Sequence, residues 1–223
     1  MPRISEKIES AQTRLAVAAK SGAVPLLLAV SKTRSENDVR EAVACGLLNF
    51  GENYLQEATA KIEALTGLNI LWHFIGSIQS NKTADIANQF DWVHTLDRIK
   101  IARRLSEQRA ETMPNLNLLI QLNIDNEDSK GGIDPSELMN LAAQIVELPK
   151  ITLRGLMAIP APRTKFEDQL EICKQIHNYY LQLQQQYPEV DTLSMGMSAD
   201  LEAATQAGSN LVRIGTDIFG PRQ

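Results

Sequence analysis

The feature that most constrains the fold of this chain is a regular alternation of short apolar runs with helical patterns. Eight apolar runs of strand length occur along the sequence, and most of the intervals between them carry apolar residues at helical spacing. Such an alternation predicts parallel strands joined by right-handed helical crossovers. The predicted strands lie within residues 25–31, 47–51, 69–76, 91–97, 115–124, 151–160, 192–197 and 210–216.

Eight strand–helix units in 223 residues favour a closed (β/α)8 barrel of the TIM type, near the lower end of its usual size. A doubly wound open sheet is the alternative fold, but its dinucleotide-binding form is disfavoured because no GxGxxG motif follows the first run. Apolar spacing over residues 4–20 predicts an extra N-terminal helix. We expect one domain over residues 1–223, with that helix in residues 1–22 and the barrel in residues 25–220.

Composition narrows the class of partner and the compartment. The net charge of −5 and the pI of about 5.3 argue against nucleic acid as the main partner. Cys45 and Cys173 form no metal-binding or disulfide pattern and suit a reducing compartment. The first 20 residues lack the apolar region of a signal peptide, and no run has membrane-spanning length. We therefore expect a cytoplasmic protein that does not bind membranes, and a monomer because no large apolar patch is evident.

Lys32 stands directly after the first apolar run, in the stretch LLLAVSK. In most proteins a lysine at a strand exit is simply solvated. At the rim of an apolar barrel, however, the charged form is disfavoured and the neutral amine becomes available to react with a carbonyl. Other residues at the strand exits are needed to decide between the two interpretations.

The exits of the last two strands contain small and hydroxylated residues, where barrels often bind phosphate. The stretch SMGMS holds Ser194 and Ser198, and we expect Ser198 to be the N-cap of a helix over residues 199–208. Gly215 and Thr216 follow the eighth strand. Asp200 and Glu202 count against a nearby dianion, so the pattern alone leaves phosphate binding open.

Arg213 and His73 are polar residues within apolar runs. A buried arginine needs a partner, either a carboxylate of the barrel or a ligand. A lone histidine in such a strand is more often a satisfied core residue than a catalyst, and the three histidines show no metal-ligand spacing. A reactive amine, a phosphate loop and an inward arginine together point to pyridoxal 5′-phosphate (PLP) held as a Schiff base at Lys32.

Several motifs closely resemble the YggS/PROSC family of pyridoxal phosphate homeostasis proteins, over about residues 30–220. They are AVSKT, FGENYLQE, WHFIGSIQSNK, GLMAIP, LSMGMSADLEAA and VRIGTDIFG. The resemblance implies a single-domain barrel like the N-terminal domain of alanine racemase, with the Schiff base at Lys32 and Asn53 near the ring hydroxyl. It also implies Arg213 at the pyridine nitrogen, His73 in or near the pocket, and a phosphate site made of Ser194, Met195, Ser198, Gly215 and Thr216.

The resemblance further implies a binding protein that buffers or delivers PLP, without established catalytic activity. Arginine keeps its proton near neutral pH, so a pyridine nitrogen opposite Arg213 stays unprotonated and the ring is a poor electron sink. Since the sequence ends at Gln223, we expect no second domain to supply a base on the other ring face, and we expect transfer to apo-enzymes. A racemase-like PLP enzyme is the alternative, and an aldolase with a Schiff-base lysine is disfavoured.

Overall fold

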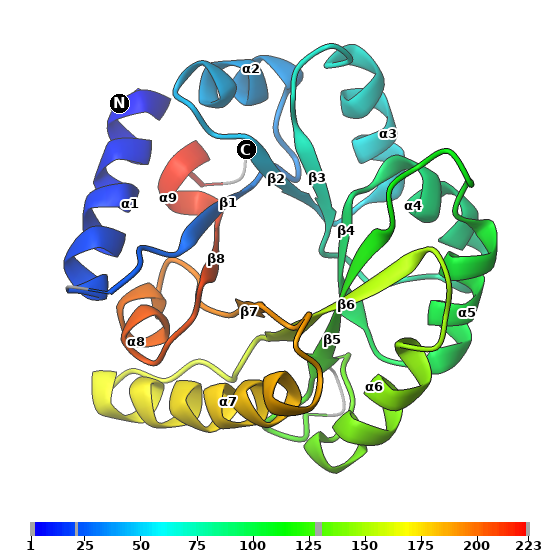
Figure 1. The fold of residues 1–223 in the computed structure, drawn as a ribbon. Helices are drawn as coiled ribbons and strands as arrows, with labels where there is room; N and C mark the ends of the chain where they lie inside the picture. The colour runs from blue at the N-terminus through cyan, green and yellow to red at the C-terminus, as the bar shows by residue number, and fades with distance from the viewer. Residues whose placement is uncertain (1–2, 21, 128–130, 222–223) are drawn as a thin grey trace.

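The computed structural model is a closed barrel of eight parallel strands and describes residues 3–20, 22–127 and 131–221. The strands follow one another around the barrel in chain order, and β1 closes the ring by pairing with β8 (Figure 1). Their bounds are β1 Leu26–Val30, β2 Asn49–Glu52, β3 Leu71–Phe74, β4 Trp92–Leu96, β5 Leu116–Leu122, β6 Ile151–Ala158, β7 Thr192–Ser194 and β8 Leu211–Ile214. The predicted (β/α)8 barrel and all eight predicted strands are confirmed, and the open sheet is excluded.

The helices form a ring outside the strands (Figure 1). They are α1 Ile4–Ala19, α2 Glu36–Ala44, α3 Leu55–Ala64, α4 Thr83–Gln89, α5 Ile99–Gln108, α6 Leu138–Ile145, α7 Phe166–Gln186, α8 Leu201–Gln206 and α9 Thr216–Phe219, with 3-10 turns at Ser80–Lys82 and Pro135–Glu137. The extra N-terminal helix is confirmed as α1, which buries Ile8, Ala11 and Leu15. It packs against α8 and α9, which adjoin the last two strands.

The barrel closes tightly between β6 and β7 because Gly155 has no side chain. Its φ of +147° lies in the region that glycine favours, and a Cβ there would lie 1.8 Å from the carbonyl oxygen of Thr192. The β5–β6 register shifts between Leu118 and Leu119, opposite this point. Because all eight strands are parallel and the barrel is closed, their carboxyl ends meet at one mouth. This mouth is where a barrel of this type carries its functional site.

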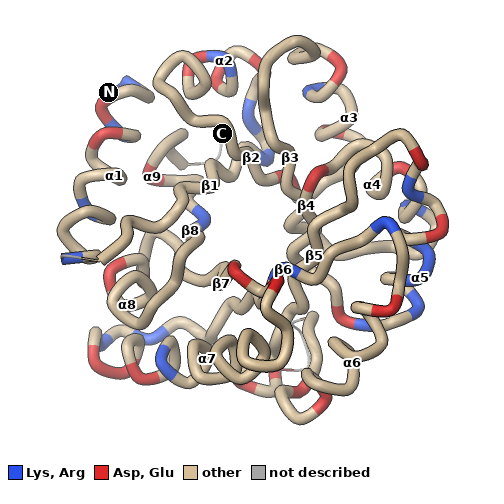
Figure 2. Tube along the Cα trace, in the orientation of Figure 1, with Lys and Arg blue, Asp and Glu red and all other residues tan. Residues whose placement is uncertain are grey.

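Charged residues of both signs are spread around the outer helices (Figure 2). The basic stretch from Arg98 to Arg104 lies on and beside α5, where Lys100 and Arg103 are exposed and the Arg104 guanidinium donates to the hydroxyl of Thr83. In the described part of the chain, no helix combines the length and the apolar character needed to cross a membrane.

Candidate functional site

A cavity of about 310 Å³ opens at the mouth of the barrel, above the ends of β1 and β8. Six of the nine expected site residues line it: Lys32, Asn53, Ser198, Arg213, Gly215 and Thr216. Apolar side chains from the exits of β1, β3, β6 and β7 complete the wall: Val30, Ile75, Met157, Ile159, Met197 and Ala199. An amine, a guanidinium, an amide and two hydroxyls thus converge from strands that are far apart in sequence. This arrangement suits a small anionic, ring-shaped ligand.

Lys32 enters the cavity directly after β1, and its side chain is half-buried. The next residue, Thr33, has a φ of +62°, so the chain turns sharply away after Lys32. The cavity wall beside Lys32 includes the apolar side chains of Val30 and Ile75. The structure thus places this amine at the apolar rim that the sequence predicts.

Arg213 is buried on β8 and is held by acceptors of the barrel itself. One terminal nitrogen donates to both the carbonyl oxygen and the hydroxyl of Ser194, at 2.9 and 2.6 Å, and the other donates to the carbonyl oxygen of Ala158 at 3.0 Å. Burial lowers the pKa of Arg213 to about 10, which still leaves it charged at neutral pH. None of the hydrogen bonds among the described residues uses Nε, so this N–H remains available to a ligand acceptor.

His73 does not line the cavity, and its expected place in or near the pocket stays a prediction. Its ring is fully buried; Nε2 lies 3.0 Å from Oδ1 of Asn49 and Nδ1 lies 2.9 Å from Nε2 of His94. Nδ1 of His94 in turn lies 3.1 Å from the hydroxyl of Ser194, which accepts from Arg213. Two polar partners thus satisfy this side chain in the barrel interior.

The buried hydrogen bonds from Arg213 through Ser194, His94 and His73 to Asn49 all have their donors on the same side. Because the guanidinium of Arg213 can only donate, the Ser194 hydroxyl is free to donate its own proton to Nδ1 of His94. Nε2–H of His94 then donates to Nδ1 of His73, and Nε2–H of His73 donates to Oδ1 of Asn49. Burial lowers the pKa of His73 to about 3 and that of His94 well below its usual value, so both rings are neutral. Ser194, which we expect at the phosphate, lies outside the cavity lining, and its hydroxyl accepts a hydrogen bond from Arg213.

The two methionines of SMGMS have opposite environments. Met195 is fully buried in the core, whereas Met197 is 39% exposed and lines the cavity. Gly196 between them has a φ of +96°, and a Cβ there would lie 2.6 Å from that of Ala204, so only glycine fits. The backbone turn at Gly196 directs the side chain of Met197, not that of Met195, to the cavity, and the expected place of Met195 at the phosphate stays a prediction.

Ser198 lines the cavity but does not cap a helix, which corrects an expectation from the sequence. Helix α8 begins at Leu201 with Asp200 at the N-cap position, and the Asp200 carboxylate accepts from the backbone N–H of Met197 at 2.7 Å. The Ser198 hydroxyl is therefore not consumed by a helix terminus. It remains on the cavity wall with Thr216.

Arg14 of α1 is a residue that the sequence analysis missed. Its guanidinium donates to Glu202 at 2.7 Å, to Asp217 at 2.7 Å and to the carbonyl oxygen of Ser198 at 3.0 Å. The hydrogen bond from Arg14 lowers the pKa of Glu202. Of the two acidic residues that counted against a phosphate, Glu202 thus has a cation beside it. No local pattern reveals this, because Arg14 and Glu202 are 188 positions apart.

Comparison with known proteins places the chain in a family. The family model for the N-terminal domain of alanine racemase matches residues 8–223. The pyridoxal phosphate homeostasis protein of Escherichia coli K12 is 49% identical over 227 residues, covering 100% of this chain and 95% of that protein. Its counterpart in Vibrio cholerae is 52% identical over 223 residues, covering 98% of this chain and 93% of that protein. The chain belongs to the family of pyridoxal phosphate homeostasis proteins.

Solved structures agree with this family. PipY of Synechococcus elongatus PCC7942 without PLP superposes with a TM-score of 0.89 at 34% identity, covering 98% of this chain and 100% of PipY. PipY with PLP bound superposes with a TM-score of 0.86, also at 34% identity and with the same coverage. Alanine racemase from Corynebacterium glutamicum shares the fold, with a TM-score of 0.73 at 17% identity over 60% of that protein.

The cavity of this family member fits a PLP-sized ligand by its own geometry. The Oδ1 atom of Asn53 is buried without a hydrogen-bond partner in the described part of the chain, at the wall of the cavity. A Cβ on Gly215 would lie 3.2 Å from the carbonyl oxygen of Val30, so a side chain there would crowd the wall. Oδ1 of Asn53 and Nε of Arg213 thus offer an acceptor and a donor at the cavity wall for the polar groups of such a ligand.

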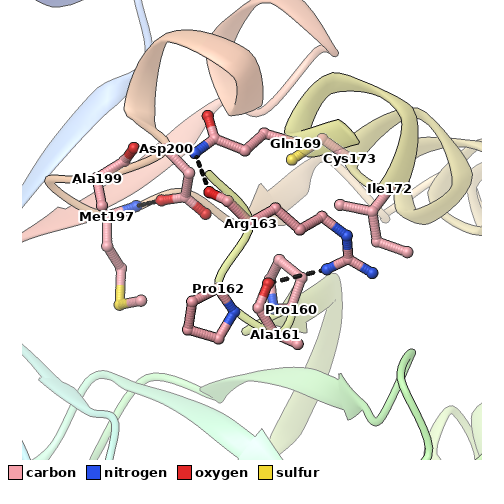
Figure 3. A pocket seen from close by; sticks show the side chains of 10 residues that line it. All are labelled: Pro160, Ala161, Pro162, Arg163, Gln169, Ile172, Cys173, Met197, Ala199 and Asp200. Carbon is pink, nitrogen blue, oxygen red and sulfur yellow. Dashed lines mark hydrogen bonds between the residues drawn. The ribbon is translucent and has the colours of Figure 1, made fainter. Parts of the chain in front are cut away.

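A second cavity of about 90 Å³ lies beside the first and shares Met197 and Ala199 with it. Figure 3 shows Met197 and Asp200 on one side and the prolines of the β6 exit, Pro160 and Pro162, near them. Cys173 of α7 also lines this cavity, and burial raises its pKa to about 12, so the thiol stays protonated.

Proposed function

We propose that this chain binds PLP in the cavity above β1 and β8 and serves to hold and release it, as a homeostasis protein rather than an enzyme. The observation that carries the proposal is the convergence of Lys32, Arg213, Asn53 and two hydroxyls on one cavity of about 310 Å³. Family membership supports it, since a relative at 34% identity has been solved with PLP bound.

Each residue then has a role that follows from its chemistry. The amine of Lys32 holds the cofactor as a Schiff base, and Nε–H of Arg213 donates to the pyridine nitrogen. Asn53 faces the ring, while Ser198, Gly215 and Thr216 hold the phosphate. When bound, PLP supplies an aldehyde that condenses with an amine and a ring that withdraws electrons if its nitrogen is protonated. Arg213, charged at neutral pH, donates a hydrogen bond to this nitrogen and keeps it unprotonated.

The lining of the cavity supports holding rather than turnover. Among the described residues that line it, the ionisable side chains are Lys32 and Arg213. Moving a proton at a substrate carbon needs a further acid or base within hydrogen-bond reach. A racemase-like activity is the alternative, and incubation of the PLP-loaded protein with L-alanine separates the two: formation of D-alanine would favour the enzyme.

We further propose a cytoplasmic, monomeric protein that passes PLP to apo-enzymes. The support for this compartment is that both cysteines, Cys45 and Cys173, are free thiols, as in reducing conditions. Transfer is tested by mixing the PLP-loaded protein with an apo-enzyme while a scavenger removes free PLP. Activation faster than spontaneous release is the expected result, and activation limited to the release rate would remove the delivery role.

The first test of PLP binding is an absorbance spectrum of the protein with added PLP. We expect a band at about 420 nm that borohydride abolishes, with the reduced adduct mapping to Lys32 by peptide mass spectrometry. Lys32→Ala removes the amine and should lose the band. Lys82→Ala is the matched control, because Lys82 lies beyond the end of β3, in the 3-10 turn Ser80–Lys82, and lines a different cavity. A wild-type protein without the band, or a band that survives in Lys32→Ala, would overturn the assignment.

A further inference from the structure

A buried lysine on α3, Lys61, lies next to the backbone that carries Lys32. Only 4% of Lys61 is exposed. Its ammonium donates to the carbonyl oxygen of Ser31 at 2.6 Å, to Glu52 at 2.7 Å and to Glu57 at 2.6 Å. An ammonium has three N–H donors, and here each has an acceptor. Lys61 is therefore held in one position.

The same group of residues ties the chain on both sides of Lys32. Before it, the carbonyl oxygen of Ser31 accepts from Lys61, and the Ser31 hydroxyl donates to Glu52 at 2.6 Å. After it, the backbone N–H of Thr33 donates to Oε1 of Glu57 at 2.5 Å. That oxygen is also the one that accepts from Lys61. One ammonium thus links the residue before Lys32 to the residue after it.

Burying the charged side chains of Lys61 and Glu52 costs desolvation free energy, which indicates that this ion pair has a role beyond packing. Glu52 is fully buried, and its second oxygen has no hydrogen-bond partner among the described residues. Burial raises the pKa of Glu52, and the positive charge of Lys61 opposes this shift. An apolar pair of similar size would stabilise a barrel at least as well as such a buried ion pair. The backbone of Thr33, with a φ of +62°, also needs a contact that holds it there.

We propose that Lys61, together with Glu52 and Glu57, positions Lys32 by fixing the backbone on both sides of it. Among the described residues that line the cavity, none of these three appears, so they act through Lys32 and not on the ligand. The inference rests on the proposed role of Lys32 as the PLP-binding amine. Its physical basis is that an amine held in the right place reacts more readily than one on a mobile turn.

The test compares Lys61→Met with Arg109→Met, each measured for PLP affinity and for unfolding without PLP. Arg109 is the matched control because it is also a buried cation that donates to backbone carbonyl oxygens. Its partners are the carbonyl oxygens of Ala87, Phe90 and Pro114, which lie at the opposite end of the barrel from Lys32. Both variants should lower the unfolding midpoint. We expect PLP affinity and the rate of band formation to fall about ten- to a hundredfold in Lys61→Met only. Equal PLP affinity in the two variants would overturn the proposal.

A second pair of variants decides the matter if Lys61→Met does not fold. The Glu57 side chain is 28% exposed, so its replacement is tolerated more easily. Glu57→Gln keeps an oxygen that accepts from Thr33, whereas Glu57→Ala does not. Weaker PLP binding in Glu57→Ala, largely restored in Glu57→Gln, supports positioning. Wild-type binding in both contradicts it. If the wild-type band itself is missing, the proposed function fails, whereas a normal wild-type band with unaffected variants rejects only the positioning role.

Discussion

A single hydroxyl, that of Ser194, connects the buried histidines of the barrel to the guanidinium of Arg213. It accepts from Arg213 at 2.6 Å and lies 3.1 Å from Nδ1 of His94. Hydrogen bonds arranged in one direction strengthen one another in a low-dielectric interior. At the scale of the residue, therefore, we expect Ser194 to influence ligand binding through Arg213, although Ser194 does not line the cavity.

Ser194→Ala should weaken both stability and PLP binding. The change leaves Nδ1 of His94 buried without a donor, which costs about 1–3 kcal/mol of unfolding free energy. It also removes one of the acceptors that orient Arg213, so PLP affinity should fall by about tenfold, measured by titration at the absorbance band.

Ser106→Ala is the control for this prediction. Ser106 is 2% exposed and its hydroxyl donates to the carbonyl oxygen of Pro149, on the far side of the molecule from the cavity. It should lower the urea midpoint without changing PLP affinity. If Ser194→Ala also left PLP affinity unchanged, the buried hydrogen bonds of Ser194 and His94 would have no part in orienting Arg213.

At the scale of the element, α1 joins the barrel to the loops that carry the hydroxyl groups of the site. Its apolar face packs inward, and Arg14 binds Glu202 of α8, Asp217 of α9 and the backbone of Ser198. Helix α1, which precedes the barrel in sequence, thus fixes the relative positions of α8 and α9 at the end of the barrel sequence. Figure 1 shows α1, α8 and α9 beside one another.

Arg14→Met should reduce stability slightly and PLP affinity measurably. The guanidinium is about one-third exposed, so its ion pairs contribute about 1 kcal/mol rather than the larger value of a buried pair. Without Arg14, the carboxylate of Glu202 lies uncompensated near the hydroxyl-lined end of the cavity, and we expect about threefold weaker PLP binding. Isothermal titration at low and high salt measures this.

Arg3→Met provides a control on the same helix. Arg3 is 77% exposed in its side chain and pairs with Glu6, one turn along α1. It should leave PLP binding unchanged at every salt concentration. Equal affinities for Arg14→Met and Arg3→Met would show that α1 contributes only packing.

At the scale of the whole molecule, the barrel interior is partly polar, and its two buried histidines are neutral. His73 and His94 are completely buried, and Trp92 stacks on the ring of His73 with centroids 5.4 Å apart. Protonation of either ring would break the one-way chain of donors, because an imidazolium has no acceptor. The fold is therefore coupled to pH through groups far from the solvent.

The free energy of unfolding should fall as the pH drops below 6.5. The pKa of His73 is lowered from 6.5 to about 3 and that of His94 is also lowered, so the unfolded chain binds protons that the folded barrel rejects. The stabilisation is complete above 6.5 and is lost progressively toward pH 3. Near pH 5 the loss from His73 should reach about 2 kcal/mol, and the loss from His94 adds to it in the same direction. Urea unfolding at pH 7 and pH 5 measures it.

The variant His177→Gln is the control for the pH dependence, because His177 is only half-buried on α7. The free energy of unfolding of this variant should still fall between pH 7 and pH 5 by most of the wild-type amount. His73→Asn combined with His94→Gln should remove most of it. A protein whose stability is flat over this interval would contradict the assignment of neutral buried rings.

The sequence by itself determined the barrel and several of the residues that line the cavity at its mouth. Alternating strand and helix patterns dictate a parallel sheet, and the carboxyl ends of parallel strands must meet at one mouth. Residues at strand exits, such as Lys32 and Arg213, could therefore be assigned to one site without coordinates. The separation between Lys32 and Thr216 along the chain did not matter, because β1 and β8 are neighbours in any closed barrel.

Only the tertiary structure decided which side chains face the cavity and which support it. The left-handed turn at Gly196 directs Met197, not Met195, to the cavity, and no strand periodicity predicts such a turn. His73 and Ser194 are satisfied by partners from other strands. Lys61 resembles a solvated helix lysine until Glu52 and Ser31 are seen beside it. These assignments depend on contacts between distant segments, and hydrogen-bond partners in a barrel interior are set by its three-dimensional closure rather than by local pattern.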